Sequence, residues 1–440
     1  MGRKSLGIDK IAMDLVCTDD IAGKKELSKK ISGIAYKKGI YPSSIHDLYM
    51  AYGRGEVSGF TVPAINLRSM TYDLARAIFR TAMKNNSGAF IFEIAKSEMG
   101  YTAQPPAEFT GVILAAAIKE GWQGPVFIQA DHTQVNAKKF QEDPDKELKA
   151  LGDVISDAVA CGFYNIDIDS STLVDLSKTD IKKQQKSNYE VCAKLTQLIR
   201  RIEPKGITVS VGGEIGEVGH QNSIPEDLRA FMEGYKEKLR KGLIGISKIS
   251  IQTGTSHGGI VNSDGSIAEV KLDFNTLKTL SGISQKEFGL GGAVQHGAST
   301  LPEDMFHKFP ENNTLEVHLA TGFQNMMFDS RHFPEALKNK IYEWLKVNAA
   351  NERKAGESDE QFFYKTRKKA LGPFKKEIMG LSEEIRDAIA GEIESKFDFL
   401  FKQLDAINNR SIVDKYVQLK RVISRKRSEK EIVHDGEGAD

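Results

Sequence analysis

The chain has 440 residues, of which 40% are hydrophobic and 28% are charged, and its formal net charge is +1. This balance provides no bulk attraction to nucleic acid or to a membrane surface, and no run approaches the ~18 apolar residues of a membrane span. The three cysteines lack metal-site spacing and suggest a reducing compartment, and the first residues do not resemble a signal peptide. We therefore expect a cytoplasmic protein without nucleic-acid or membrane partners.

The chain begins with a lysine-rich segment, residues 1–58, which we predict to be an N-terminal helical segment. From residue 59 to 333, short β-rich runs alternate with segments of helical periodicity such as Tyr72–Asn85 and Asn188–Ile202. The runs are Phe60–Asn66, Ala89–Ala95, Val126–His132, Tyr164–Ser170, Thr208–Gly216, Ile246–Gly254, Gly292–Gly297 and Leu315–Thr321. Strands that alternate with helices predict parallel β/α units, and eight units over roughly 270 residues suit an α/β fold of the TIM (β/α)8 barrel type.

The remaining sequence is helical and charged. Residues 334–424 are predicted to form a C-terminal helical extension that packs on the barrel or on a second subunit. Residues 425–440 are predicted to form a mobile charged tail.

Polar residues gather where the predicted strands end, and in such barrels the carboxyl ends of the strands carry the chemistry. Among them, His132, His257 and His296 each follow a β-rich run. A single histidine at a strand end is more often a hydrogen-bonded core residue than a metal ligand. Three on one rim, however, match the ligand set of a catalytic zinc site with an open position, and we predict that they bind a metal together.

Glycines surround two of these histidines. Gly258 and Gly297 permit positive φ and close approach of the backbone to a ligand. The loop of small residues from Gly297 to Thr300 could direct amides and hydroxyls at a phosphate, as loops after strands seven and eight of such barrels do. Without the adjacent His296, an ordinary tight turn would be the better interpretation.

Together these strings resemble the class II, metal-dependent fructose-bisphosphate aldolase family, in the same order and over roughly residues 58–330. The matching strings are Phe60–Asn66, Asp131–His132, Tyr164–Ser171, Glu214–Gly216, Gly254–Gly258 with Val270–Asp273, and Gln295–Asp304. Each string alone is weakly specific, whereas the ordered set is a strong signal.

The resemblance implies a metal site formed by His132, His257 and His296. Zn²⁺ is the expected ion, although Co²⁺, Fe²⁺ or Mn²⁺ would accept the same ligands. It would polarise the carbonyl of dihydroxyacetone phosphate and stabilise the enediolate, while Asp131 exchanges a proton with the C4 hydroxyl. Asp169 and Glu214 would form a second metal site or orient a ligand imidazole.

The resemblance also implies a set of substrate-binding residues, with a monovalent cation nearby as an option. These residues are Asn66, Ser97, Gly258, Gly297, Ser299, His318 and Thr321. The family members are dimers or larger, so we expect a homodimer or homotetramer. Arg367 or Lys368 could then reach the phosphate pocket of a partner subunit, although a basic run is more often a solvated face.

This sequence departs from the family pattern at three places. Ala298 replaces a glycine after the third histidine, and His318 stands where the family has an asparagine. The loop after the fifth strand is also altered, so the proton carrier at the dihydroxyacetone carbon stays open among Glu217, His220 and Glu226.

The expected activity is reversible cleavage of fructose 1,6-bisphosphate into dihydroxyacetone phosphate and glyceraldehyde 3-phosphate, a step of glycolysis and gluconeogenesis. Alternatives are tagatose 1,6-bisphosphate or another phosphorylated ketose as the substrate, or a non-catalytic partner subunit on the same barrel. A Schiff-base mechanism would instead require a desolvated lysine, for which Lys96 is the nearest candidate.

Overall fold

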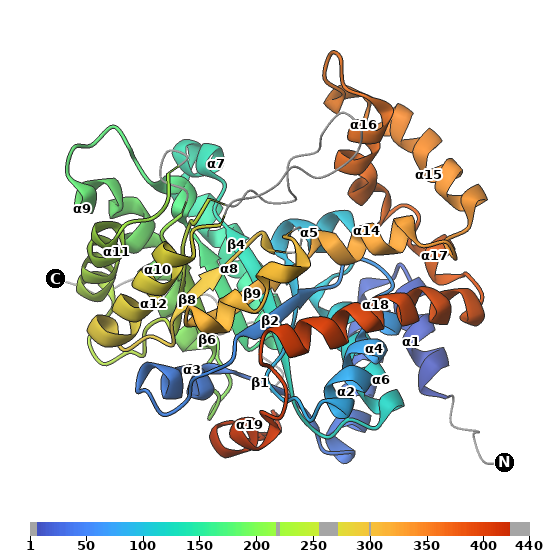
Figure 1. The fold of residues 1–440 in the computed structure, drawn as a ribbon, viewed down its shortest axis with the longest axis horizontal. Coiled ribbons are helices and arrows are strands. Elements are labelled where there is room, and N and C mark those ends of the chain that lie inside the picture. Colours follow the sequence, from blue (N-terminus) through green and yellow to red (C-terminus); the bar gives the residue numbers. More distant parts are fainter. Residues whose placement is uncertain (1–6, 217–220, 255–271, 299–300, 423–440) are drawn as a thin grey trace.

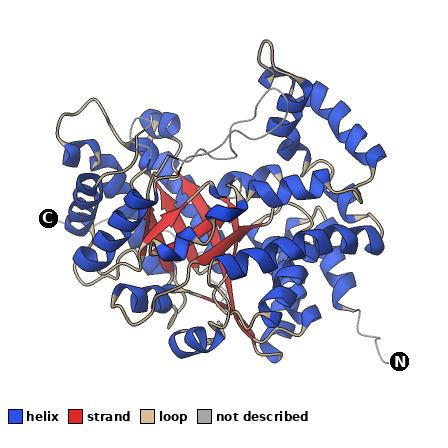
Figure 2. Ribbon diagram, in the orientation of Figure 1, coloured by secondary structure: helices blue, strands red, loops and turns tan. Residues whose placement is uncertain are grey.

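The computed structural model describes residues 7–216, 221–254, 272–298 and 301–422. Its centre is a closed barrel of eight parallel strands surrounded by helices (Figures 1 and 2). The strands are β2 (Val62–Asn66), β3 (Ile91–Ala95), β4 (Gly124–Gln134), β5 (Asn165–Asp169), β6 (Ser210–Glu214), β7 (Lys248–Ser250), β8 (Ala293–Gln295) and β9 (Thr314–Leu319). The barrel closes because β4 pairs with both β3 and β5. The predicted TIM barrel is confirmed.

Helices follow the strands and cover the outside of the barrel. They are α4 (Thr71–Lys84), α5 (Lys96–Tyr101), α6 (Pro106–Glu120), α7 (Ala137–Glu142), α8 (Pro144–Ala160), α9 (Ile181–Gln184), α10 (Lys186–Ile202), α11 (Pro225–Lys238), α12 (Phe274–Phe288), α13 (Lys308–Glu311) and α14 (Thr321–Asp329). The two helices predicted from periodicity correspond to α4 and α10. Their apolar faces are buried against the strands, which is the packing that such a stripe favours.

The segment before the barrel contains α1 (Ile8–Cys17), α2 (Ile21–Lys37) and α3 (His46–Gly53), but it is not helical throughout. Between α2 and α3, β1 (Ile40–Ser43) pairs in parallel with the first residues of β4. Gly39, at a φ of 78°, turns the chain out of α2 and into this strand. The prediction of a helical segment is therefore wrong for these four residues, because so short a strand shows no countable periodicity.

The barrel strands are buried on both faces, as expected for parallel sheets covered by helices. Such barrels are normally filled by branched apolar side chains. Here the interior also holds charged and polar side chains, each at most 7% exposed, namely Glu93, Gln129, Asp167, Lys248, Glu316 and His318. This polar interior lies directly beneath the rim on which the predicted site residues are placed.

The C-terminal extension contains α15 (Glu335–Asn348), α16 (Asp359–Thr366), the 3-10 turn η5 (Arg367–Ala370), α17 (Lys375–Met379), α18 (Glu383–Gln403) and α19 (Arg410–Tyr416). Helix α18 packs on the barrel: the ring centroid of Phe397 lies 4.9 Å from that of Phe323 on α14, and the ring centroid of Phe401 lies 5.7 Å from that of Phe90, just before β3. In contrast, α15 and α16 project away from the barrel at the upper right of Figure 1. Part of the extension is thus continuous with the barrel's own core.

Arg367, one of two residues expected to reach the phosphate pocket of a partner subunit, is instead engaged within its own chain. Its guanidinium lies 2.8 Å from Asp329 Oδ1 and 2.5 Å from Asn325 Oδ1, and the residue is 4% exposed. Lys368 beside it is exposed.

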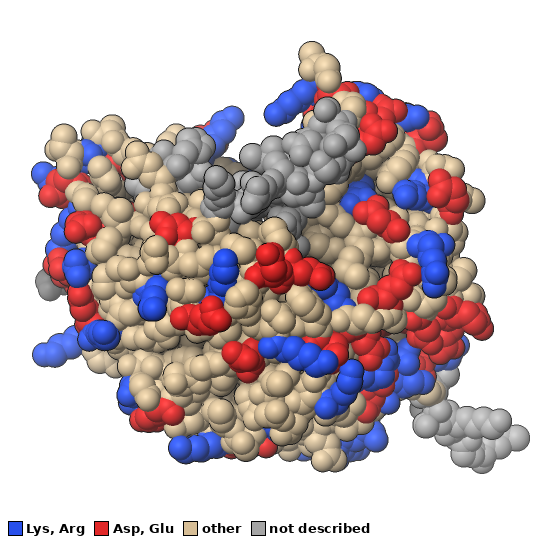
Figure 3. All heavy atoms as spheres, viewed as in Figure 1, with Lys and Arg blue, Asp and Glu red and all other residues tan. Residues whose placement is uncertain are grey.

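Within the described ranges, no helix has both the length and the apolar character needed to cross a membrane. On the face seen in Figure 3, basic and acidic side chains are interspersed. This mixture agrees with the near-neutral net charge. The predicted tail at 425–440 lies outside the described residues.

Candidate active site

A cavity of about 400 Å³ opens at the carboxyl ends of the strands. Its described lining residues are Asn66, Arg68, Glu93, Ala95, Lys96, Ser97, Glu98, Asp131, His132, Gln134, Asn136, His296, Gly297, His318, Ala320 and Thr321. They come from β2, β3, β4, β8 and β9 and from the residues that follow these strands. The rim predicted from the sequence therefore encloses a real cavity.

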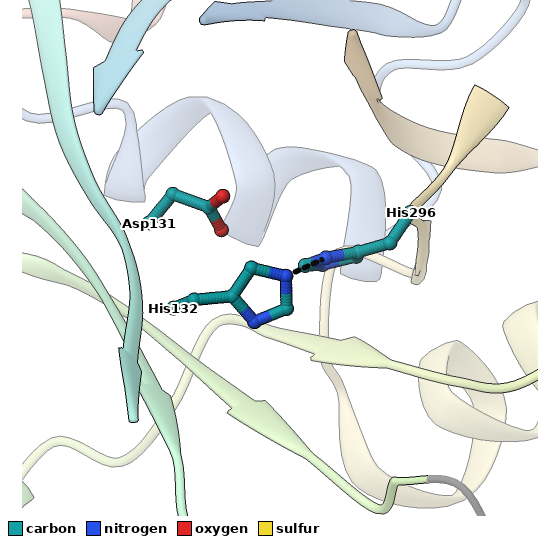
Figure 4. A group of neighbouring side chains, drawn as sticks. All are labelled: Asp131, His132 and His296. Carbon is teal, nitrogen blue, oxygen red and sulfur yellow. Dashed lines mark hydrogen bonds between the residues drawn. The ribbon is translucent and has the colours of Figure 1, made fainter. Parts of the chain in front are cut away.

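Asp131 and His132 are neighbours on β4, yet both side chains point toward His296 (Figure 4). In a regular strand, consecutive side chains point to opposite faces. Here the pairing of β4 with β5 shifts register between Ala130 and Thr133, and His132 has a φ of 38°. This bulge places a non-glycine residue in the left-handed region, a strained arrangement that clusters at functional sites.

The two described histidines of the predicted metal site meet directly. His132 Nε2 lies 2.7 Å from His296 Nδ1, and Ser250 Oγ at the end of β7 lies 2.8 Å from His296 Nε2. One nitrogen or oxygen from each of Asp131, His132 and His296 lies within 4.8 Å of the others. Convergent imidazole and carboxylate donors suit Zn²⁺ and similar divalent ions, so the residues present fit the metal that was predicted.

Two carboxylates lie on the other side of the His132 ring. Asp169 Oδ2 and Glu214 Oε2 lie 3.5 and 3.6 Å from His132 Nδ1. Burial raises the pKa of Asp169, but contacts with His132, Ser171 and Gln134 lower it overall. Burial and the charge of Asp169 raise the pKa of Glu214 to about 8. Asp169 is thus the carboxylate favoured to stay ionised and to orient the His132 ring.

The carboxylate of Asp131 faces His318 across the cavity floor. His318 Nδ1 lies 3.3 Å from Asp131 Oδ1 and 3.0 Å from Glu93 Oε2. Burial raises the pKa of Asp131, but the charges of His132 and His318 hold it well below its ordinary value. Asp131 is therefore ionised at neutral pH and available to accept a proton.

Arg68, two residues beyond β2, is a cavity residue that the sequence analysis did not identify. Its Nε lies 2.7 Å from Glu98 Oε1, and its Nη1 lies 3.3 Å from Thr321 Oγ1. Glu98 Oε2 in turn accepts hydrogen bonds from Asn66 Nδ2 at 2.5 Å and from the Ala95 amide at 2.8 Å. Glu98 thereby fixes the positions of Arg68 and Asn66 in the cavity wall.

The structure places several other predicted residues at the cavity. Ser97 and Thr321 line it at the first turns of α5 and α14, and Gly297 lines it with a φ of 70°. Lys96 also lines it, donating to the Gln134 carbonyl at 2.6 Å, and burial lowers the pKa of Lys96. Glu226, in contrast, is exposed in the first turn of α11 and is not part of the described lining.

The remaining predicted residues lie outside the described parts of the chain. They are His257 and Gly258, Ser299, and the proton-transfer candidates Glu217 and His220.

Comparison with known families identifies the chain. The family model described as fructose-bisphosphate aldolase class-II matches residues 52–398. The chain belongs to the class II fructose-bisphosphate aldolase family. The matched range includes His132 and His296 of the predicted metal site, Asp131 and most of the C-terminal extension. No curated protein sequence matches the chain.

The solved structures that resemble this chain are distant from it in sequence. A probable tagatose 6 phosphate kinase from Sinorhizobium meliloti is 13% identical at a TM-score of 0.54, with 81% of this chain and 99% of that chain covered. A fructuronate-tagaturonate epimerase from Cohnella laeviribosi is 13% identical at a TM-score of 0.53, with 79% and 82% covered. A fructose-bisphosphate aldolase from Campylobacter jejuni is 18% identical at a TM-score of 0.48, with 84% and 97% covered. At these identities, the likeness to the first two structures, whose TM-scores exceed 0.5, supports the fold alone.

The charged residues inside the barrel were also missed, although the sequence contains a signal for them. Glu93, Asp167, Lys248 and Glu316 interrupt the apolar runs of predicted buried strands. Such residues are almost never fully buried unless they are paired. A charge in the middle of a parallel strand therefore predicts a partner on another strand of the barrel. Arg68, in contrast, follows its strand in a loop, where no pattern indicates its direction.

Proposed function

We propose that this protein is a metal-dependent aldolase that reversibly cleaves fructose 1,6-bisphosphate into dihydroxyacetone phosphate and glyceraldehyde 3-phosphate. Family membership supports the reaction class. The observation that carries the proposal is the convergence of His132, His296 and Asp131 on one side of the cavity. The cavity volume of about 400 Å³ falls within the range of small-molecule sites.

In this proposal, His132, His296 and His257 hold a divalent cation. The bound cation would act as a Lewis acid on the substrate carbonyl oxygen. Asp169 keeps the His132 ring oriented through Nδ1, and Ser250 does the same for His296 through Nε2. These contacts fix the rings before substrate arrives, which lowers the cost of assembling the site.

Asp131 is the base in the cleavage direction. Its carboxylate accepts the proton of the C4 hydroxyl, the C4–O bond becomes a carbonyl, and the C3–C4 bond breaks with its electron pair left on C3. In the synthetic direction the same group returns the proton. An ionised carboxylate has a free lone pair for this proton, and its burial leaves the charge little screened by water.

Arg68 provides a cationic group in the cavity wall. Its guanidinium lies beside Thr321, at the N-terminus of α14, and Glu98 holds it in place. A guanidinium fork matches the geometry of a phosphate or carboxylate. We assign Arg68, with Ser97 and Thr321, to the anionic part of the substrate.

The test is a comparison of kcat/KM for fructose 1,6-bisphosphate and tagatose 1,6-bisphosphate, which differ at one stereocentre. A preference for the fructose compound supports the proposal, whereas a preference for the tagatose compound reassigns the substrate within the same chemistry. Absence of cleavage of either compound by protein with a full complement of metal would favour the non-catalytic subunit. Trapping by borohydride at Lys96 would favour the Schiff-base alternative.

A further inference from the structure

We infer that Lys248 and Glu316, inside the barrel, are positioning residues that act on Asp131 through His318. The inference rests on the proposed function, because Asp131 is the base of that reaction. Neither residue belongs to the described cavity lining. Glu316 contacts His318, which does line the cavity, and the effect of both residues on the reaction is assigned to this contact.

Glu316 on β9 is the centre of this interior network. Its Oε1 lies 2.6 Å from His318 Nε2, 2.5 Å from Lys248 Nζ and 3.0 Å from Gln129 Nε2. Its Oε2 accepts a hydrogen bond from the Tyr49 hydroxyl. Glu316 is completely buried, so both of its oxygens are engaged by protein groups rather than by water.

Lys248 on β7 joins Glu316 to two further strands. Its Nζ lies 2.9 Å from Asp167 Oδ2 on β5 and 2.8 Å from Gln129 Oε1 on β4. Space for this arrangement comes from Gly212 on β6. A Cβ at that position would lie 2.3 Å from Asp167 Oδ1 and 3.0 Å from Lys248 Cε. The Lys248 ammonium is thus surrounded by oxygens from β4, β5 and β9. This arrangement fixes the position of the Glu316 carboxylate.

His318 transmits this arrangement to the cavity. Its ring is stacked on that of His296, with centroids 4.1 Å apart and an angle of 15° between the planes. Glu316 holds Nε2 at one edge of the ring, and at the other edge Nδ1 faces Asp131 Oδ1 and Glu93 Oε2. Stacking on His296 fixes the plane of the His318 ring, and the contact with Glu316 fixes how the ring is rotated within that plane. The position of Nδ1 beside Asp131 therefore depends on Glu316.

Stability alone is a weak explanation for these charges. Replacing a buried ion pair with well-packed apolar side chains is often neutral or stabilising, because the charges lose their hydration. Barrels of this type are ordinarily filled with branched apolar residues. A polar network whose upper end contacts Asp131 is better explained by the orientation of that carboxylate.

A double-mutant cycle tests the inference. We expect Glu316→Leu to lower kcat by about 10- to 100-fold, the usual effect of losing an outer orienting partner, with KM and metal content nearly unchanged. Glu316→Gln keeps an acceptor for His318 and should retain more activity. In a His318→Asn background, Glu316→Leu should cause almost no further loss, because the pathway through His318 is already broken.

A second variant and a matched control keep the test decisive if Glu316→Leu does not fold. Tyr49→Phe removes only the hydroxyl that donates to Glu316, and we expect kcat to fall about fivefold, the equivalent of one hydrogen bond. The control is Glu108→Gln, which alters an equally buried carboxylate paired with Lys24 and Lys375 away from the cavity. It should lower the thermal midpoint and leave kcat unchanged.

A proton NMR measurement tests the geometry without any assay of activity. The Nε2 proton of His318, assigned by its loss in His318→Asn, should be downfield and slow to exchange. The signal of this proton should persist in Glu108→Gln and disappear in Glu316→Leu. If Glu316→Leu does not fold, the signal should shift in Tyr49→Phe.

Two outcomes would overturn the inference. One is an equal loss of kcat from Glu316→Leu in the wild-type and His318→Asn backgrounds, and the other is a His318 proton signal that does not change when Glu316 or its partner Tyr49 is replaced. If the wild-type protein cleaves no ketose bisphosphate, the proposed function fails while the NMR result still decides the geometry.

Discussion

His132 Nε2 and His296 Nδ1 lie 2.7 Å apart although the two residues are 164 positions apart in the chain. The barrel brings them together by placing the carboxyl ends of β4 and β8 on one rim, and the bulge in β4 turns His132 inward beside Asp131. The first consequence concerns the metal. His132→Ala and His296→Ala should each lower the content of tightly bound divalent ion, because each removes a nitrogen ligand.

Metal analysis of the purified variants by mass spectrometry measures this loss. His332→Ala is the matched control, since His332 is a partly exposed histidine that lies beside Glu392 rather than a cavity residue. Full metal content in both ligand variants would show that these histidines do not hold the ion.

Asp131→Asn separates metal binding from chemistry. The amide preserves the shape of the side chain but cannot accept the hydroxyl proton, so kcat should fall by about 10²- to 10⁴-fold, the usual contribution of a general base. Metal content should stay near that of the wild type. Steady-state kinetics measures kcat, and metal analysis of the same samples measures the metal content. A kcat near that of the wild type would show that Asp131 is not the base.

Arg68 should govern affinity for the anionic group of the substrate. Arg68→Met removes the guanidinium and is expected to raise KM about 10- to 100-fold, in line with the loss of hydrogen bonds to a charged group. Arg68→Lys keeps the positive charge but lacks the forked guanidinium, so its KM should lie between that of the wild type and that of Arg68→Met. Arg80→Met, which breaks an ion pair with Glu394 on the outer helices, is the control. A KM unchanged in Arg68→Met would mean that the anion binds elsewhere.

His46, at the start of α3, predicts a pH dependence of stability. Burial and then the charge of Arg200 lower the pKa of His46 to about 4, from an ordinary 6.5. Between these values the unfolded chain binds a proton that the folded chain does not, so stability falls as pH drops from 6.5 toward 4. At 1.36 kcal/mol per pKa unit, the loss is about 3 kcal/mol.

Denaturant titrations at pH 7 and pH 4.5 measure this dependence. His46→Gln removes the titrating group, so the variant should lose less stability than the wild type over the same pH interval. If the two proteins show parallel losses, other groups account for the acid sensitivity.

The fold and the rim of the site were largely accessible from the sequence, whereas the interior was not. Alternating β-rich runs and helical stripes determine a parallel barrel, and such a barrel necessarily gathers strand ends like those at Asn66 and His296 on one rim. The bulge at His132 could not be foreseen, because it depends on how β4 pairs with β5. Lys248 and Glu316 were not predicted to pair, because in the sequence each is a single charged residue within an apolar run. Their proximity depends on the folded barrel, in which β7 and β9 lie on either side of β8.

The most direct test of the account is cleavage of fructose 1,6-bisphosphate by the protein before metal removal, after chelation, and after a divalent ion has been restored. The account predicts cleavage that is lost on chelation and regained with Zn²⁺ or a similar ion in wild-type protein, but not in His296→Ala. Cleavage that continues undiminished in metal-free protein would contradict it.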